Sequence, residues 1–269
     1  MPRIMKLLQI ATFCGMLTFL GSTLVCAEWY LGAYGGYSAA QSLKDVTMNN
    51  FGLRSAVAQT HFGVNDLRLG NSLAQNFETS DVALKQSPLF GGKGGYFFSE
   101  QGLSWLGVEV EAFTSKPSIK QQTLSTTQGI TFTLSPGVTP SPPPCGPPDS
   151  HTCSWQSTQH GQLNLTESSL RVIVVAFNVV ARYPDKVFQP YIGVGVGAFY
   201  FSSSGQIDGS QVVPGLNAQA GIKVLVTEEW GLFVEGKYNL ANINNLDQTF
   251  GVSGQYSAFN AVAGLAYHF

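Results

Sequence analysis

The last fourteen residues, 256–269, constrain the fold more than any other part of the chain. Counting back in steps of two from the last residue gives an unbroken apolar series: Phe269, Tyr267, Leu265, Ala263, Ala261 and Phe259. The residues between them are smaller or more polar. Because successive side chains of a strand point to opposite faces, this pattern predicts a β-strand with one apolar face. A soluble protein gains little by ending such a strand on a bare phenylalanine.

The composition limits what else the chain can be. It has 269 residues, of which 11% are charged, and a formal net charge of −2. A size of this order fits one large β domain, and the charge balance gives no footprint for nucleic acid. No apolar run after residue 27 reaches the roughly 20 residues that a membrane helix needs. If the rest of the chain spans a membrane, it must therefore form a closed barrel, which pairs every backbone group internally.

Residues 1–27 have the features of a secretory signal. Two positive residues precede an apolar stretch at 7–25, and a small residue, Ala27, offers a cleavage site. We expect a mature domain at 28–269. A lipoprotein with Cys26 as the lipidated residue is the alternative, although Val25 stands where a small residue is wanted.

Eight apolar-alternating segments follow the signal. They lie at 29–37, 88–98, 104–114, 170–183, 190–201, 216–226, 231–240 and 256–269. Tight turns join the second to the third, the fourth to the fifth and the sixth to the seventh. The other connections are predicted as long loops, at about 38–87, 115–169, 202–215 and 241–255. Segment length and alternating connections are typical of a bacterial outer-membrane barrel with periplasmic turns. The sequence thus predicts an all-β, eight-stranded antiparallel up-and-down transmembrane β-barrel with long extracellular loops and periplasmic termini.

Charged residues within these segments share one face. They are Lys93, Glu109, Glu111, Arg182, Lys223, Glu235 and Lys237. A soluble barrel such as a lipocalin would turn them outward, whereas a membrane barrel turns them inward. Unbroken apolar faces, aromatic residues at strand ends and the export signal favour the membrane barrel. An eight-stranded interior is just wide enough for its side chains, so we expect a paired network that plugs the lumen.

Several pieces of the sequence, taken in order, carry a resemblance to a known family. They are PLFGGKGGYFF at 88–98, LGVEVEAF at 106–113, NVVARYP leading to QPYIGVGVG at 178–197, and TEEWGLFVEGKY at 227–238. With the closing strand, they resemble the small eight-stranded outer-membrane β-barrel superfamily, which includes opacity-type surface proteins and the membrane domain of outer-membrane protein A. The first two loops are longer than the family pattern.

The resemblance has implications for partners. It implies that Phe269, with Tyr267 and Leu265, forms a terminal signal read by the barrel assembly machinery. It also implies a monomer in contact with outer-membrane lipids and lipopolysaccharide, with no cofactor and no bound nucleic acid. The loops could bind a surface ligand, which the sequence does not identify.

The second predicted loop carries a proline-rich segment at 136–148, which is a surface spacer or a recognition segment. Cys145 and Cys153 lie eight residues apart in this loop. In an exported protein they are expected to form a disulfide. A metal site that adds His151 and His160 is the alternative, but its spacing matches no standard motif.

Motifs for catalysis are weak. Gly193, Gly195 and Gly197 precede no helix pattern, so we interpret them as small residues facing the barrel interior rather than as a nucleotide loop. His268 is at the predicted periplasmic end of its strand and has no evident nucleophile partner. The sequence therefore favours a non-enzymatic surface protein that contributes to envelope integrity, adhesion or defence. A narrow porin-like channel and a lipid A-modifying enzyme are the alternatives.

Overall fold

The computed structural model describes residues 28–48, 72–134 and 153–269. These residues form β-strands and one short 3-10 turn, Ser99–Gln101. Eight strands make a barrel: β1 (Glu28–Ala40), β4 (Ser87–Phe98), β5 (Leu103–Ser115), β9 (Ser168–Arg182), β10 (Phe188–Ser204), β11 (Gly209–Leu225), β12 (Trp230–Ile243) and β13 (Val252–His268). Within the described ranges, no helix is long and apolar enough to span a membrane.

The barrel closes between its first and last strands. β1 pairs antiparallel with β13 over eleven residue pairs, from Tyr30 opposite His268 to Ala40 opposite Ala258. On its other side β1 pairs with β4, and the remaining strands follow in sequence order around the ring. Closure leaves no barrel strand with an unpaired edge, as lipid requires. The predicted eight-stranded antiparallel barrel is confirmed.

Three short connections lie at one end of the barrel, which we call the turn end: 99–102, 183–187 and 226–229. The opposite end is the loop end. In the second of these turns, the exposed Asp185 carboxylate accepts hydrogen bonds from the backbone N–H groups of Val187 (2.9 Å) and Phe188 (3.1 Å). These two bonds favour the charged carboxylate and lower the pKa of Asp185. These local bonds help to shape the turn, and the backbone N–H of Leu225 on β11 also donates to the Val187 carbonyl at 2.9 Å.

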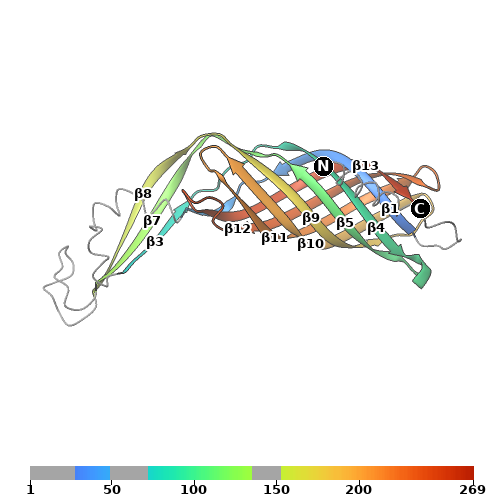
Figure 1. The fold of residues 1–269 in the computed structure, drawn as a ribbon, viewed down its shortest axis with the longest axis horizontal. Helices are drawn as coiled ribbons and strands as arrows, with labels where there is room; N and C mark the ends of the chain where they lie inside the picture. Colours follow the sequence, from blue (N-terminus) through green and yellow to red (C-terminus); the bar gives the residue numbers. More distant parts are fainter. Residues whose placement is uncertain (1–27, 49–71, 135–152) are drawn as a thin grey trace, which may run out of the picture.

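The two longest predicted loops contain strands. The segment 38–87 includes β2 (Lys44–Met48) and β3 (Ser72–Thr79), and 115–169 includes β6 (Ser118–Ile119), β7 (Gln122–Leu134) and β8 (Cys153–Leu165). β2 pairs with β13 and β3, β3 with β7, and β7 with β8. We call β3, β7 and β8 the arm; it projects from the loop end of the barrel (Figure 1). The sequence gives little sign of these strands. β7 and β8 are rich in Thr, Ser and Gln, so they show little alternation of apolar and polar residues.

The two shorter predicted loops also contain strand residues at both ends. β10 and β11 stay paired as far as Ser203 opposite Gly209, so the 202–215 connection shrinks to 205–208. Likewise β12 and β13 stay paired as far as Ile243 opposite Gly254, which leaves 244–251 as the connection. The apolar alternation weakens beyond the membrane-facing part, but backbone pairing needs no apolar side chain. Strand ends predicted from hydrophobicity were therefore too early.

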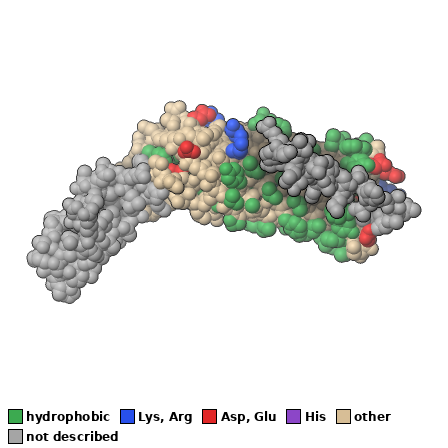
Figure 2. Space-filling model, in the orientation of Figure 1, with side chains coloured by type: hydrophobic (Ala, Val, Ile, Leu, Met, Phe, Trp, Pro, Cys, Tyr) green, Lys and Arg blue, Asp and Glu red, His purple; other side chains and the backbone are tan. Residues whose placement is uncertain are grey.

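Large apolar side chains cover the outside of the barrel (Figure 2). They include Trp29, Tyr183, Ile192 and Val234, whose exposed fractions range from 57% to 66%. All such exposed residues lie on the eight barrel strands or beside their turns, and none is among the described side chains of the arm. A continuous apolar belt of this extent is far larger than the patches that soluble monomers expose. It matches the lipid-facing band of a membrane barrel.

Aromatic side chains gather in this belt near the turn end. Trp29 packs on Tyr96 and Trp230 on Tyr267, each with ring centroids 5.0 Å apart. Tyr267 also contacts Phe269 edge-on at 5.0 Å. Amphipathic rings at one level are typical of a membrane interface. Leu265, the third residue of the proposed terminal signal, also faces outward, while recognition by an assembly machinery stays a prediction.

The barrel interior has two layers. Toward the turn end it is charged, whereas toward the loop end it is an apolar core that includes Val174, Phe199, Phe201 and Tyr256. Further apolar residues roof this core at the loop end: Leu43, Met48, Val82, Leu84, Ile119, Leu246 and Phe250. β-bridges from Leu43 to Val82 and from Leu84 to Ile119 tie the roof together. On β9 the residues of both faces are apolar. The sequence therefore shows no alternation of apolar and polar residues there, and it does not reveal which residues form this core.

Three predictions concern residues outside the described ranges: the signal segment 1–27, the proline-rich segment 136–148, and Cys145 with His151. The Cys145–Cys153 disulfide, its metal-site alternative and the cleavage site therefore stay predictions.

A closed barrel should resist detergent until it is heated, because its backbone bonds form one cooperative ring. We expect unboiled protein to migrate faster on a denaturing gel than boiled protein. Equal mobility of the two samples would argue against closure between β1 and β13.

Candidate functional site

Five of the seven predicted charges form one chain of ion pairs inside the barrel. Lys93 Nζ lies 2.6 Å from Glu235 Oε2 and 3.3 Å from Glu109 Oε2. Lys237 Nζ lies 2.6 Å from Glu235 Oε1 and also pairs with Glu111. The order is thus Glu109, Lys93, Glu235, Lys237, Glu111, and each side chain is at most 2% exposed. Three strands, β4, β5 and β12, contribute these residues by inward alternation.

Neutral donors complete the coordination of the three carboxylates. The hydroxyl of Tyr30 donates to Glu109 at 2.5 Å, and that of Tyr191 donates to Glu235 at 2.7 Å. The Glu111 carboxylate accepts from the hydroxyl of Tyr34. Amide donors come from Asn178, Asn217 and Gln219. A buried charge is costly unless it is paired and hydrogen-bonded, and these contacts meet that condition.

The other two predicted charges lie nearer the turn end. Arg182 pairs with Glu28, donates from Nε to the Ser104 carbonyl at 3.0 Å, and stacks its guanidinium 3.8 Å from the Phe97 ring centroid. Lys223 Nζ lies 3.2 Å from His268 Nε2 and 4.3 Å from the Tyr30 ring centroid. Lys223 makes no ion pair with a carboxylate in the described part of the chain. The seven charges therefore share one interior but not one cluster.

Several members of the site were not expected from the sequence. Glu28 is the most important, because its carboxylate pairs with Arg182 and approaches His268 Nδ1 to 2.9 Å. With Glu28 included, the interior holds four acids (Glu28, Glu109, Glu111, Glu235) and four bases (Lys93, Arg182, Lys223, Lys237). The tyrosine ligands carried a usable signal. Tyr30 and Tyr34 alternate with the lipid-facing residues of β1 and so had to point inward.

Glycines on β10 make space for this network, as the sequence interpretation of the 193–197 segment expects. A Cβ atom at Gly195 would lie 2.2 Å from the Asn178 side-chain oxygen, and one at Gly193 would lie 3.0 Å from the Gln219 side chain. Larger residues at these positions would displace amides that hold Glu109 and Glu111. These glycines therefore serve packing.

Little free space remains among the charges. A cavity of about 10 Å³ lies between the ion-pair chain and the turn-end pair, lined by residues that include Lys93, Glu109, Arg182 and Lys223. That volume is at the lower limit for one water molecule. The apolar core and its roof fill the barrel beyond the charges. These side chains leave little room for water in this part of the described interior.

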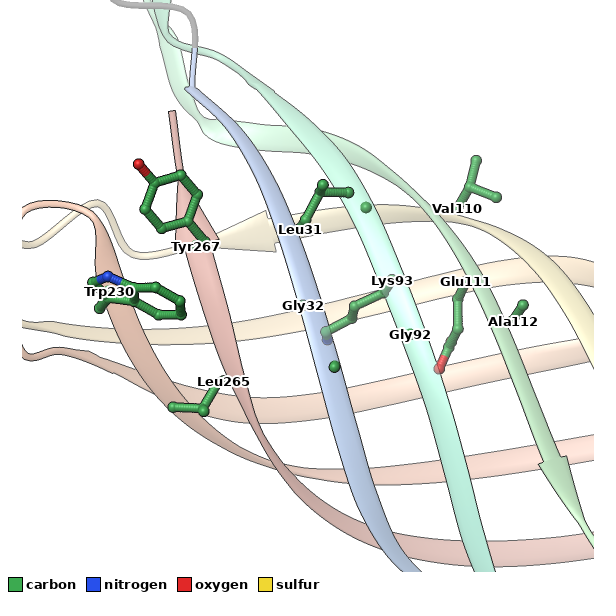
Figure 3. Close-up of a pocket in the computed structure, with 12 residues that line it drawn as sticks. Leu31, Gly32, Gly92, Lys93, Val110, Glu111, Ala112, Trp230, Leu265 and Tyr267 are labelled. Carbon is green, nitrogen blue, oxygen red and sulfur yellow. The ribbon is translucent and has the colours of Figure 1, made fainter. Parts of the chain in front are cut away.

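The outer surface of the barrel has a depression beside these charges. Gly92 and Gly94 on β4 leave a depression of about 700 Å³, bordered by residues that include Leu31, Val110 and Trp230 (Figure 3). Lys93 and Glu111 line the wall behind it, but their charged ends pair inside the barrel. The depression is therefore an apolar hollow on the belt and is not an entrance to the charged interior.

Evidence for metal or nucleophile chemistry is not found in the described residues, where no group of His, Cys, Asp and Glu is arranged to hold a metal ion. His160 lies on the arm, exposed, with its Nδ1 3.3 Å from the Thr127 hydroxyl. His268 is buried at the turn end. What the site offers chemically is a chain of five paired charges and, nearer the turn end, the Arg182–Glu28 pair.

Loss of one partner should show how much an unpaired charge in this interior destabilises the barrel. Glu111→Ala leaves Lys237 with one carboxylate partner among the described residues, Glu235, and removes the acceptor of the Tyr34 hydroxyl. We expect unfolding in urea to cost about 3–5 kcal/mol less than for the wild type. The exposed pair Lys85–Glu167, 2.6 Å apart with side chains 46% and 53% exposed, provides the control. Glu167→Ala should cost about 0–1 kcal/mol. Equal losses for the two variants would contradict a stabilising buried network.

Known protein families and solved structures provide a comparison for this fold. A family model described as the outer membrane protein beta-barrel domain matches residues 39–269. A search of curated proteins finds no match to this chain. Among solved structures, neisserial surface protein A is 13% identical, with a TM-score of 0.46 over 90% of this chain and 97% of its own.

Two further solved structures are similar to this chain. Ail, the attachment invasion locus protein of Yersinia pestis, is 11% identical, with a TM-score of 0.41 over 91% of this chain and 100% of its own. OprG, an outer membrane protein from Pseudomonas aeruginosa, is 13% identical, with a TM-score of 0.38 over 89% and 95%. The family match spans most of the sequence and agrees with the closed barrel and its apolar belt. The chain belongs to the outer membrane protein beta-barrel domain family.

Proposed function

We propose that this protein is a non-enzymatic surface protein, anchored in the outer membrane by its barrel, that presents the arm for adhesion or another interaction outside the cell. The observation that carries the proposal is the limit of the apolar belt. Exposed large apolar residues cover the eight barrel strands, and none is found among the described side chains of the arm. The belt suits lipid, and the arm suits water. In this orientation the turn end and both termini are periplasmic.

The composition of the arm supports a role in recognition. Glu78 is the single charged residue within its three strands, and hydroxyl and amide side chains dominate. Cross-strand contacts such as Thr123 Oγ1 to Asn164 Oδ1, at 2.8 Å, leave these groups at the surface. A neutral polar surface held on a sheet offers many donors and acceptors at little entropic cost. Such a surface can bind glycans or polypeptide.

The free edge of β8 strengthens the proposal. β8 pairs with β7 along its full length, and no other described strand pairs with it. Soluble proteins protect an edge strand with charge, proline or a bulge. β8 has neither a charged residue nor a proline, and its register with β7 is unbroken. An extended peptide could therefore add to this edge by backbone pairing.

The interior supports an anchoring role for the barrel. The interior holds equal numbers of acids and bases, whereas a selective filter would show an excess of one sign. The apolar roof then covers this layer at the loop end. We propose that the charges stabilise the barrel as a plug, and that the assembly machinery and membrane lipids are its partners within the envelope.

Removing the arm should separate surface binding from anchoring. Replacing residues 126–161 by a short Gly-Ser turn keeps Leu124 and Leu165, which belong to the buried core. Cells displaying this variant should lose attachment to coated surfaces while the barrel keeps its heat-dependent gel mobility. A finer variant, Thr158→Lys, adds a charge to the free edge and should reduce attachment, with Thr123→Lys on β7 as its control. Full attachment without the arm would refute the recognition role.

Conductance should test the channel alternative. Wild-type protein in planar bilayers is expected to show little or no steady current, because ion pairs and the apolar core fill the lumen. Glu111→Ala should introduce a leak if opening the plug opens the path. Steady wild-type conductance, with only ion selectivity changed in Glu111→Ala, would favour the channel and reject the plug.

A further inference from the structure

One charged residue breaks the apolar exterior of the barrel. The charged side chains of the eight barrel strands are buried in the interior or half-buried at the turn end, with the exception of Arg171 on β9, which is exposed. Arg171 lies near the loop end, where its neighbours on the same face are Ile173 and then Val175. An outward charge is costly in the middle of a bilayer and tolerated near its surface. Its position therefore marks the level of lipid head groups at the loop end.

A second cation stands beside Arg171. The register of β5 and β9 places Ser115 opposite Val172, so Lys116 reaches the level of Arg171 one residue later. Lys116 is also exposed, and both residues border the same hollow. The nearby carboxylate of Glu167 pairs with Lys85 instead, at 2.6 Å. In the described part of the chain, neither Lys116 nor Arg171 forms an ion pair. Figure 2 shows basic side chains at the border between the apolar belt and the polar end.

An apolar hollow continues from this pair of cations toward the turn end. It has a volume of about 830 Å³, and Pro88, Phe90 and Ile173 contribute to its walls. Ala112 belongs both to this hollow and to the depression of about 700 Å³ over Gly92 and Gly94. Figure 3 shows Ala112 and Gly92 side by side on β5 and β4. The two hollows thus follow one line down the lipid-facing surface.

We propose that this line is a binding site for a phosphorylated lipid of the leaflet at the loop end. Its phosphate lies between Lys116 and Arg171, and an acyl chain runs over Phe90 and Ala112 into the hollow at Gly92. A guanidinium fits a phosphate with two parallel hydrogen bonds, and the lysine adds a point charge. Small residues below leave room that a chain can fill. This proposal rests on the proposed membrane orientation. It adds the class of ligand and the position of its binding site on the barrel.

The same surface argues against a second copy of the barrel as the occupant. A partner barrel would have to bring an acid to Lys116 and Arg171 from its own apolar face. The outward-facing side chains of the eight strands include no carboxylate, because Glu109, Glu111 and Glu235 are buried and Glu28 faces Arg182. Inorganic phosphate would pair with the two cations but would leave the apolar hollow unfilled. A lipid supplies both the anion and the chain.

Native mass spectrometry of the full-length protein in neutral detergent can test the head-group half of the site, with diphosphorylated lipid A as the probe. Wild type should retain the lipid at low lipid concentration. Lys116→Gln combined with Arg171→Gln should weaken retention by about tenfold or more, the effect of losing charge-assisted hydrogen bonds to phosphate. The control double variant, Lys120→Gln with Lys186→Gln, removes two positive charges elsewhere on the protein and should retain the lipid. Equal retention in the two double variants would overturn the site.

Gly92→Leu tests the acyl half without changing charge. A Cβ at Gly92 would meet only the Gly32 carbonyl oxygen, at 3.4 Å, so the new side chain fits outward and occupies the hollow. Retention of lipid A should fall, whereas Ala220→Leu, on the outer face of β11, should have no effect. Dephosphorylated lipid A should bind weakly, and inorganic phosphate should compete poorly. Displacement by inorganic phosphate alone, or unchanged binding in Gly92→Leu, would overturn the acyl site.

Gel mobility keeps this proposal separate from the proposed anchoring. A variant that no longer retains lipid A but still shows heat-dependent gel mobility has lost the lipid site and kept the barrel. A wild-type protein that shows no heat-dependent mobility would instead remove the membrane barrel on which the site rests.

Discussion

Lipid offers no hydrogen bonds to a polypeptide backbone, and the rest of the structure depends on that constraint. The chain meets it by pairing β1 with both β4 and β13, which closes the ring and removes every free edge within the belt. Once the ring closes, alternation sends one set of side chains to lipid and the other to a narrow interior. β8 pairs on one side only among the described strands, and it lies on the arm, beyond the apolar belt.

The interior then has to accommodate charge without water. It does so with Glu109, Lys93, Glu235, Lys237 and Glu111 in alternating order, supported by tyrosine and amide donors from neighbouring strands. A buried pair of this kind contributes little compared with an apolar equivalent, but removing one member is costly. The network therefore specifies one register of the strands, since a shift by one residue would turn these charges to lipid. The proposed anchoring and the proposed exclusion of solutes rest on the same contacts.

The two surfaces outside the interior divide the remaining roles. The arm presents hydroxyl and amide groups and the unpaired edge of β8, which support the proposed role in recognition. The belt presents apolar side chains, interrupted by a hollow line that ends at Lys116 and Arg171. The strands that carry this line, β4, β5 and β9, are adjacent in the barrel, so its shape is rigid. A lipid bound there would fix the level at which the arm leaves the membrane.

Two-residue alternation determined much of this protein in advance: the eight strands, their order, and the inward direction of Lys93, Glu109, Glu111, Arg182, Lys223, Glu235 and Lys237. Such alternation is a local property, so the sequence shows it directly. The tertiary structure decided which charges meet, since Lys237 reaches Glu111 across 126 positions of sequence and Arg182 reaches Glu28 across 154. It also decided the arm, whose strands pair through backbone groups that every residue carries, and the apolar core, whose residues alternate with equally apolar ones. Where both faces of a strand have the same polarity, only packing in three dimensions distinguishes them.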